Sequence, residues 1–318
     1  GEQSRVLAVS ASCGHMWSLA VAVHGSLHNA TRARASPNAT HAYSDELSKF
    51  ARSFDLSPRF ALSSLRAPPS SEGAELPAGH CKTFHGASRC SIEWDEWVLV
   101  QALVTPSNTV LELGARYGTT SCVLAEQTGN SGNVVSVEPD ERAHAHLRHN
   151  RDAHSCNFHI VRGTVSKRRL AQGHGGSYET RTRLATAGQQ GLDNFAPAEL
   201  ERWIGSRFDT LLIDCEGCIL YVADELLHQV ELLILEEDES GPVHVNYTEQ
   251  GLRLASMGFE RFWRHHGSER STLPVGYHSA WRKPGSRFAA LPGCEEYARR
   301  MRYSQAFLHC AKFGGIAA

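Results

Sequence analysis

The chain has 318 residues, of which 41% are hydrophobic and 21% are charged, as in an ordinary globular protein with a sizeable core. Its 32 Lys and Arg nearly balance its 34 Asp and Glu, and the net charge of −2 argues against a basic nucleic-acid-binding protein and against an acidic disordered chain. The most apolar stretch, residues 6–23, is interrupted by serine, glycine and histidine, so we expect no membrane-spanning helix. The 18 histidines form no set with metal-ligand spacing, and we expect no metal.

The composition divides the chain into three regions. Residues 1–90 are predicted to be an N-terminal extension with one helix, which carries Phe54, and a Pro- and Ser-rich linker. Residues 91–284 form the main domain, and residues 285–318 are a C-terminal extension with one helix near 295–308.

Within the main domain, short apolar runs alternate with amphipathic segments. The expected helices lie at 92–104, 119–127, 140–150, 197–204, 219–227 and 247–257. The expected strands lie at 109–113, 133–137, 158–165, 208–213, 230–235, 259–264 and 277–282, while the Gly-rich, basic start of 166–207 allows no clear assignment. This alternation predicts an α/β three-layer sandwich with a mostly parallel sheet, whose ligands bind beyond the carboxyl ends of the strands.

A glycine-containing loop and a strand-end acid suggest a nucleotide site. Gly114 and Gly118 allow the backbone to turn tightly after the first strand and to approach a ligand closely. Glu138 ends the next strand, about 20 residues further on, where adenosyl and dinucleotide sites place a carboxylate on ribose hydroxyls. The alternatives are an ordinary tight turn and a solvated strand-end charge.

The same loop separates two cofactor classes. A dinucleotide loop needs a glycine two residues after Gly114, but Arg116 stands there. Glu112 would repel a pyrophosphate, whereas it suits a nearby ammonium or sulfonium group. This charge pattern favours S-adenosyl-L-methionine, and an NAD-dependent enzyme is the weaker alternative.

Three motifs resemble those of the FkbM-type family of class I S-adenosylmethionine-dependent methyltransferases: Leu111-Glu112-Leu113-Gly114-Ala115, Val137-Glu138-Pro139-Asp140 and Leu212-Ile213-Asp214-Cys215-Glu216-Gly217. The resemblance covers roughly residues 91–284. It implies a seven-stranded sheet with a reversed last hairpin, S-adenosyl-L-methionine as cofactor, and methyl transfer to a hydroxyl. The expected cofactor-binding residues are Glu112, Gly114, Ala115, Arg116, Tyr117, Gly118, Glu138, Pro139, Thr164 and Asp214, and the expected catalytic residues are Asp214 and Glu216.

The chain departs from this family at three places. Arg116 replaces a small polar residue, Cys218-Ile219 replaces a small residue and a second Glu, and residues 166–195 are longer than usual, which we expect to cover the acceptor pocket. Two fates are open to Arg116. It either turns outward to pair with the cofactor carboxylate or Glu112, or it fills the ammonium position beside Glu112 and plugs the pocket.

The nine cysteines and three N-x-Ser/Thr sequons bear on the compartment. Cys81 with Cys90, and Cys294 with Cys310, could form disulfides, whereas Cys122, Cys156 and the Cys215-x-x-Cys218 pair are most simply thiols; a redox pair or half a zinc site is the alternative for the latter. The sequons begin at Asn29, Asn38 and Asn246 and favour a glycoprotein. We therefore lean towards the secretory pathway or an organelle lumen, after removal of a targeting segment.

The function that these observations favour is methyl transfer to a hydroxyl of a small molecule or glycan. The basic run Lys167-Arg168-Arg169, with Arg181 and Arg183, suggests an anionic acceptor or else a solvated loop. No nucleic-acid partner is expected. The alternative is a catalytically retired methyltransferase fold that serves as a binding or scaffold subunit of a larger assembly.

Overall fold

The computed structural model describes residues 48–49, 52–55, 83–87, 93–174, 180–237, 244–266, 277–300 and 309–310. The elements below all belong to one compact unit, Lys49–Ala318. The sequons at Asn29 and Asn38, the Cys81 and Cys90 pair and the Pro- and Ser-rich linker lie outside the described residues. The domain boundaries at residues 90 and 284 stay predictions.

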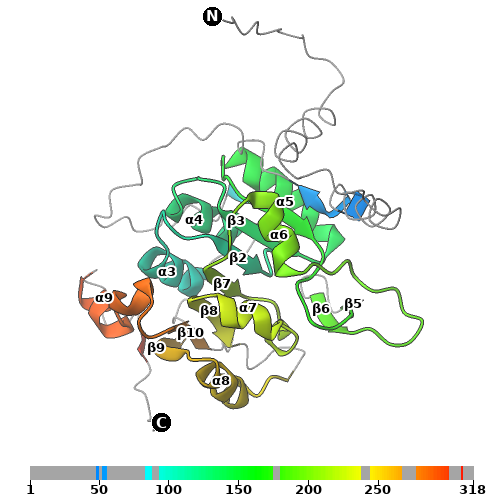
Figure 1. Cartoon of the computed structure of the whole chain (residues 1–318). Helices are drawn as coiled ribbons and strands as arrows, with labels where there is room; N and C mark the ends of the chain where they lie inside the picture. Colours follow the sequence, from blue (N-terminus) through cyan, green and yellow to red (C-terminus); the bar gives the residue numbers. More distant parts are fainter. Residues whose placement is uncertain are drawn as a thin grey trace, which may run out of the picture. The chain divides into compact units, whose positions relative to one another are not determined.

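The central sheet has nine strands in the order β1-β4-β3-β2-β7-β8-β10-β9-β11 (Figure 1). Their bounds are Phe54–Asp55 (β1), Val110–Leu113 (β2), Val134–Glu138 (β3), His159–Arg162 (β4), Thr210–Ile213 (β7), Leu232–Glu237 (β8), Glu260–His266 (β9), Tyr277–Arg282 (β10) and His309–Cys310 (β11). Strands β4, β3, β2, β7 and β8 are parallel, and β10 lies antiparallel between β8 and β9. Seven strands with a reversed last hairpin, as the family resemblance implies, are therefore present.

The count of seven strands is corrected to nine, because a two-residue strand is added at each border of the sheet. Phe54, expected on a helix, instead lies in β1, where its backbone pairs with the open edge of β4 opposite Val161. This pairing provides hydrogen-bond partners for backbone groups on both strands that would otherwise bind water. It therefore outweighs the helical spacing of apolar residues that predicted a helix around Phe54.

Helices cover both faces of the sheet. Their bounds are Trp94–Leu103 (α3), Thr119–Gln127 (α4), Glu141–Ala153 (α5), Pro197–Ile204 (α6), Asp224–Gln229 (α7), Tyr247–Ser256 (α8) and Cys294–Arg300 (α9). Alternate strand residues reach opposite faces: Val110 and Val134 pack in the core with α3 and α4, whereas Leu111 and Val135 pack in the core with α6 and α7. The three-layer sandwich is confirmed.

Two segments differ from the sequence prediction. The ambiguous region contains an antiparallel hairpin, Leu170–His174 (β5) and Thr180–Leu184 (β6), outside the main sheet. The helix expected at 219–227 is divided into a 3-10 turn at Cys218–Leu220 and α7, because Ala223 between them has an extended backbone (φ −66°, ψ 136°). Among the described helices, none is long and apolar enough to cross a membrane.

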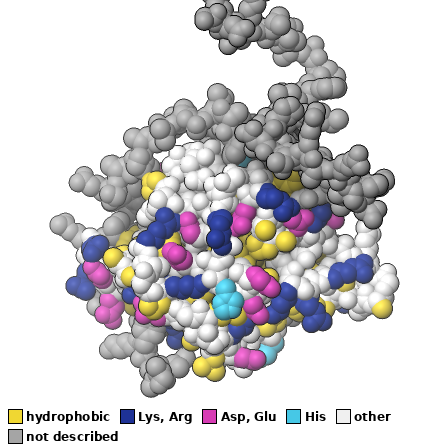
Figure 2. Space-filling model, viewed as in Figure 1, with side chains coloured by type: hydrophobic (Ala, Val, Ile, Leu, Met, Phe, Trp, Pro, Cys, Tyr) yellow, Lys and Arg dark blue, Asp and Glu magenta, His cyan; other side chains and the backbone are white. Residues whose placement is uncertain are grey.

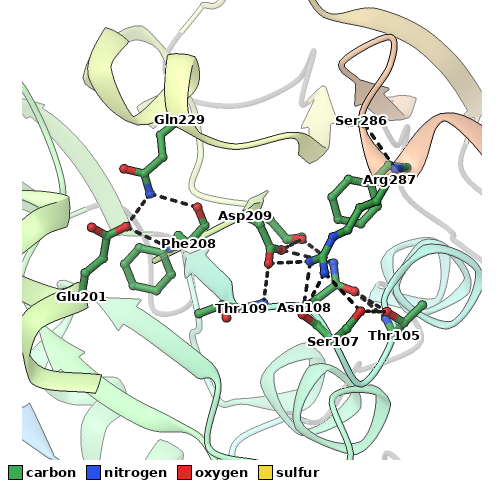
Figure 3. Close-up of polar contacts among 12 residues, drawn as sticks. Thr105, Ser107, Asn108, Thr109, Glu201, Phe208, Asp209, Gln229, Ser286 and Arg287 are labelled. Atoms are coloured by element: carbon green, nitrogen blue, oxygen red, sulfur yellow. Dashed lines mark hydrogen bonds and ion pairs between the residues drawn. The ribbon is translucent and has the colours of Figure 1, made fainter. Parts of the chain in front are cut away.

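A polar network joins the amino-terminal ends of β2 and β7 (Figure 3). Asp209 accepts hydrogen bonds from the Thr109 amide, at 3.1 Å, and from the Arg287 guanidinium, at 2.5 Å. Asn108 donates to the Thr210 hydroxyl at 2.6 Å. The charge at this end of β7 is thus paired with donors and with a cation.

On the surface that Figure 2 shows, basic and acidic side chains are interspersed.

Candidate functional site

The loop after β2 is shaped by two glycines. Gly114 has a φ of +105°, and a Cβ atom there would lie 1.5 Å from the carbonyl oxygen of Asp214. Gly118 has a φ of +81°, and a Cβ atom would lie 2.7 Å from Leu147 Cδ1. At position 114 only glycine fits, so the loops that follow β2 and β7 can touch at the carboxyl edge of the sheet, whereas at position 118 glycine mainly relieves the left-handed φ.

Glu138, at the end of β3, holds this loop in place. Its Oε2 accepts a hydrogen bond from the Arg116 amide at 2.8 Å, and its Oε1 accepts one from the Asp140 amide at 2.6 Å. Burial raises the pKa of Glu138 to about 7, against the opposing effect of these hydrogen bonds. Each carboxylate oxygen retains a second lone pair, so the expected ribose contact is chemically open and stays a prediction.

Arg116 pairs with Asp140, a partner that the sequence analysis did not consider. The Nη1 atom of Arg116 lies 2.9 Å from Asp140 Oδ2, and the two side chains are 16% and 2% exposed. Asp140 also binds Arg142, at 2.8 Å, and it caps α5 by accepting from the Arg142 amide. The two cations make Asp140 the anchor of this side of the loop.

Other residues in the glycine loop, and Glu112 in the strand before it, also make local contacts. Buried Glu112 accepts a hydrogen bond from the Ser121 hydroxyl at 2.5 Å, and burial raises its pKa to about 7. The Ala115 carbonyl accepts from the Gly118 amide at 2.7 Å. The ring of Tyr117 lies 4.9 Å from the Arg116 guanidinium carbon.

A small, largely apolar pocket opens beside this loop. Its walls include Gly114, Pro139 and Thr164, which come from the loops after β2, β3 and β4, together with Cys215 and Cys218. Leu170 and Thr182 of the β5–β6 hairpin also line it. Its apolar walls are compatible with the face of a planar ring, whereas the position of the hairpin over an acceptor stays a prediction.

Acidic side chains gather around Asp214, and three of them were not expected as site residues. Glu93 and Glu96 begin α3, and Glu236 lies near the end of β8. Burial raises the pKa of Glu93 to about 8, and burial followed by the negative charge of Asp214 raises that of Glu96 and Glu236 well above the usual range. A side-chain hydrogen bond with Asp214 adds to the rise in the pKa of Glu236.

The two expected catalytic residues lie in the loop after β7. The Asp214 amide donates to the Leu113 carbonyl at 2.9 Å, which ties this loop to β2. Glu216 has a left-handed φ of +54°, an uncommon conformation for a residue with a side chain. Both carboxylates are close enough to Glu236 to raise its pKa, so the structure brings them together with the acids of α3 and β8.

The cysteine predictions are partly wrong. In the described part of the chain, disulfides join Cys122 to Cys156, Cys215 to Cys218 and Cys294 to Cys310. The last pairing was predicted, but the first two pairs were expected to be thiols. Cys122 and Cys156 are 34 residues apart, and their approach depends on the packing of α4 against the segment after α5, which sequence spacing does not reveal.

One buried group, Asp95, His265 and His278, has the composition of a metal site. The indole N–H of Trp263 donates to His265 Nδ1 at 2.8 Å, and an indole nitrogen can only donate. The ring proton of His265 therefore lies on Nε2, which is 3.3 Å from Asp95 Oδ1. Metal binding at Nε2 would move this proton to Nδ1, where it would oppose the Trp263 N–H, so the geometry favours a histidine–carboxylate contact in the core.

Comparison with known proteins gives matches in fold only. No family model and no curated protein matches the sequence. The structure is similar to a putative rRNA methylase from Clostridium thermocellum (9% identity, TM-score 0.40), with 60% of this chain and 95% of that chain covered. It is also similar to a putative O-methyltransferase from Klebsiella pneumoniae (14%, TM-score 0.37; 85% and 99% covered) and to Aeropyrum pernix fibrillarin with bound S-adenosyl-L-methionine (14%, TM-score 0.37; 59% and 74% covered). At these scores, the assignment of the fold rests on the strand order.

Proposed function

We propose that this protein is an S-adenosyl-L-methionine-dependent methyltransferase of the FkbM type that transfers a methyl group to a hydroxyl of a small molecule or glycan. The observation that carries the proposal is the contact between the Gly114 loop and Asp214, beside an apolar cavity and Glu138. This constellation lies at the carboxyl edge of a sheet whose strand order suits an adenosyl ligand.

The residues of the site would divide the work between binding and proton transfer. S-adenosyl-L-methionine, when bound, would supply an electrophilic methyl group on a sulfonium. Glu138 would hold ribose hydroxyls, Pro139 and Thr164 would face the adenine, and Glu112 would face the ammonium group. Asp214 or Glu216 would position the acceptor and take its proton, a contribution of roughly 10²–10⁴-fold in rate.

Glu138→Ala is the direct test. The variant removes two backbone hydrogen bonds and the proposed ribose contact, so S-adenosylhomocysteine should bind at least about tenfold more weakly by calorimetry. Arg162→Ala, on the exposed part of the neighbouring strand, is the matched control and should bind as the wild type does. No binding to the folded wild type would refute the enzyme proposal and favour the scaffold alternative. The acceptor class, including the expectation against nucleic acid, needs a separate assay of methyl incorporation.

We further propose that the chain folds in an oxidising compartment such as the secretory pathway. Three disulfides support this, because cytosolic proteins rarely keep them. Asn246 is exposed and caps α8 through its side-chain oxygen, which accepts from the Glu249 amide at 3.2 Å, so its nitrogen could carry a glycan without loss of the cap. Mass spectrometry of native protein should find a glycan at Asn246; a bare asparagine together with reduced cysteines would contradict the proposal.

A further inference from the structure

The disulfide Cys215–Cys218 lies inside the loop that carries both proposed catalytic carboxylates. Its cysteines are three residues apart, whereas the other two disulfides join residues 34 and 16 apart. A bridge across so short a segment restricts little of the unfolded chain. Its main physical effect is therefore on the local shape of the loop.

That local shape is unusual. Glu216 and Gly217, the two residues inside the bridge, have left-handed φ angles of +54° and +94°. Glycine adopts this conformation readily, but a glutamate does so only when its surroundings impose it. The bridge closes a small ring around Glu216 and supplies such a constraint.

The same loop meets the proposed cofactor site at two places. The Asp214 carbonyl fills the space that a side chain at position 114 would need. Cys215 and Cys218 line the cavity together with Pro139 and Thr164. A change in the loop would thus alter both the wall of the cavity and the position of the carboxylates.

The site disulfide is also open to attack. Cys215 and Cys218 are both partly exposed, whereas Cys122 and Cys156 are both buried; in the third bridge Cys294 is buried and Cys310 is partly exposed. Thiol–disulfide exchange requires access of a thiolate to a sulfur atom. A dithiol in solution should therefore reduce Cys215–Cys218 before Cys122–Cys156.

We propose that the Cys215–Cys218 disulfide is a positioning element of the site, and that its reduction by a dithiol lowers the affinity of the site for its adenosyl ligand. The identity of that ligand rests on the proposed function. In the reaction, one thiolate of the dithiol attacks a sulfur of the bridge and forms a mixed disulfide. The second thiol of the dithiol then displaces the protein sulfur and closes the dithiol's own disulfide. Two electrons and two protons are thereby transferred to Cys215 and Cys218, which become free thiols.

The test combines ligand binding with a redox titration. S-adenosylhomocysteine is titrated into the full chain after equilibration with oxidised and reduced dithiothreitol at graded ratios, and free cysteines are alkylated and identified by mass spectrometry. We expect affinity to fall at least about tenfold with the same midpoint as the labelling of Cys215 and Cys218, while Cys122–Cys156 stays intact and the melting temperature is unchanged. Equal affinity of the oxidised protein and of protein reduced only at Cys215–Cys218 would overturn the proposal.

Two variants complete the design. Cys215→Ser/Cys218→Ser should bind weakly whether or not the dithiol is present, and Cys294→Ser/Cys310→Ser should keep the redox response. Hydrogen exchange of residues 214–221 is measured in parallel without ligand. If the oxidised wild type binds no S-adenosylhomocysteine, the proposed function fails, and the exchange data decide the inference by themselves: faster exchange on reduction supports a positioning role, and unchanged exchange refutes it.

Discussion

Strand β7 has an aspartate immediately before it and another immediately after it, and the two have opposite surroundings. Asp209, at the amino end, accepts from the Thr109 amide and pairs with Arg287 (Figure 3). Asp214, at the carboxyl end, shares a hydrogen bond with Glu236 and raises the pKa of Glu96 by its negative charge. The first arrangement stabilises the fold, whereas the second places like charges together at a cost in folding free energy.

The difference indicates at which end of β7 the binding of a ligand would relieve electrostatic repulsion. Carboxylates that crowd one another would be relieved by a cationic group, and a sulfonium or ammonium beside Glu112 and Asp214 would supply it. Folding alone does not need such crowding, since Asp209, five residues away at the other end of the same strand, is fully paired. The four predictions that follow test this contrast.

The largest effect is expected from Gly114→Ala at the carboxyl edge. The added Cβ atom would lie 1.5 Å from the Asp214 carbonyl oxygen, in a backbone conformation that alanine disfavours. Urea denaturation should show a loss of at least about 3 kcal/mol in unfolding free energy. Gly205→Ala, where φ is also positive but no atom lies within 4 Å, should cost only about 1 kcal/mol. Similar losses in the two variants would contradict the close contact of the two loops.

The matched pair Asp209→Asn and Asp214→Asn tests the contrast directly. Asp209→Asn removes the charge that pairs with Arg287 and should lower the unfolding free energy by about 1–2 kcal/mol without a change in S-adenosylhomocysteine binding. Asp214→Asn removes one of several crowded charges, so stability should hold or rise slightly while activity falls. If Asp214→Asn is the more destabilising of the two, the carboxyl edge is not electrostatically strained.

The pH dependence of stability should reveal the crowded acids. The pKa of Glu112 and Glu138 is about 7 and that of Glu93 about 8 in the folded protein, against 4.5 for an ordinary Glu, and burial is the main cause. A raised pKa means that the folded state binds protons more tightly than the unfolded state does. The contribution of these groups to the unfolding free energy is therefore highest below pH 4.5, and it is lost as the pH rises through 7 and 8. Denaturation at graded pH should show this decline, and Glu93→Gln should remove its part between pH 7 and 8. A stability that rises over this range would contradict the assignment.

The smallest effect is expected from Arg116→Asn. Arg142 remains as a partner for Asp140, and asparagine tolerates the positive φ of position 116 better than arginine does. We expect a loss of under about 1 kcal/mol in stability and a change of less than about threefold in S-adenosylhomocysteine binding. A large gain in binding would instead mean that Arg116 plugs the site, as one of the two alternatives for this residue holds.

Most strands of the sheet and part of the candidate site can be predicted from local sequence patterns. The apolar runs and their spacing predict the positions of the seven main strands to within a few residues, because burial on both faces leaves little freedom in composition. The glycine loop and Glu138 follow from their places just after strands. Glu93 and Glu96 were missed because acids in the first turn of a helix are common for electrostatic reasons and reveal nothing about what lies opposite.

The contacts that escaped prediction depend on three-dimensional approach. Arg116 and Asp140 lie 24 residues apart and meet only because β2 and β3 pair side by side. The Cys122–Cys156 disulfide likewise needs two segments that no periodicity links. The Asp214–Glu236 contact depends on the neighbouring ends of β7 and β8, which the prediction of a parallel sheet allowed but did not single out.

The Cys122–Cys156 disulfide closes a covalent ring that contains the whole of β3 and α5, including Glu138 and Asp140. A protease that cuts once within this ring leaves both fragments joined through sulfur. The nicked chain would therefore migrate at full length on a non-reducing gel and separate into two bands only after reduction. A segment that anchors a ligand-binding loop is in this way protected from loss even after its backbone has been broken.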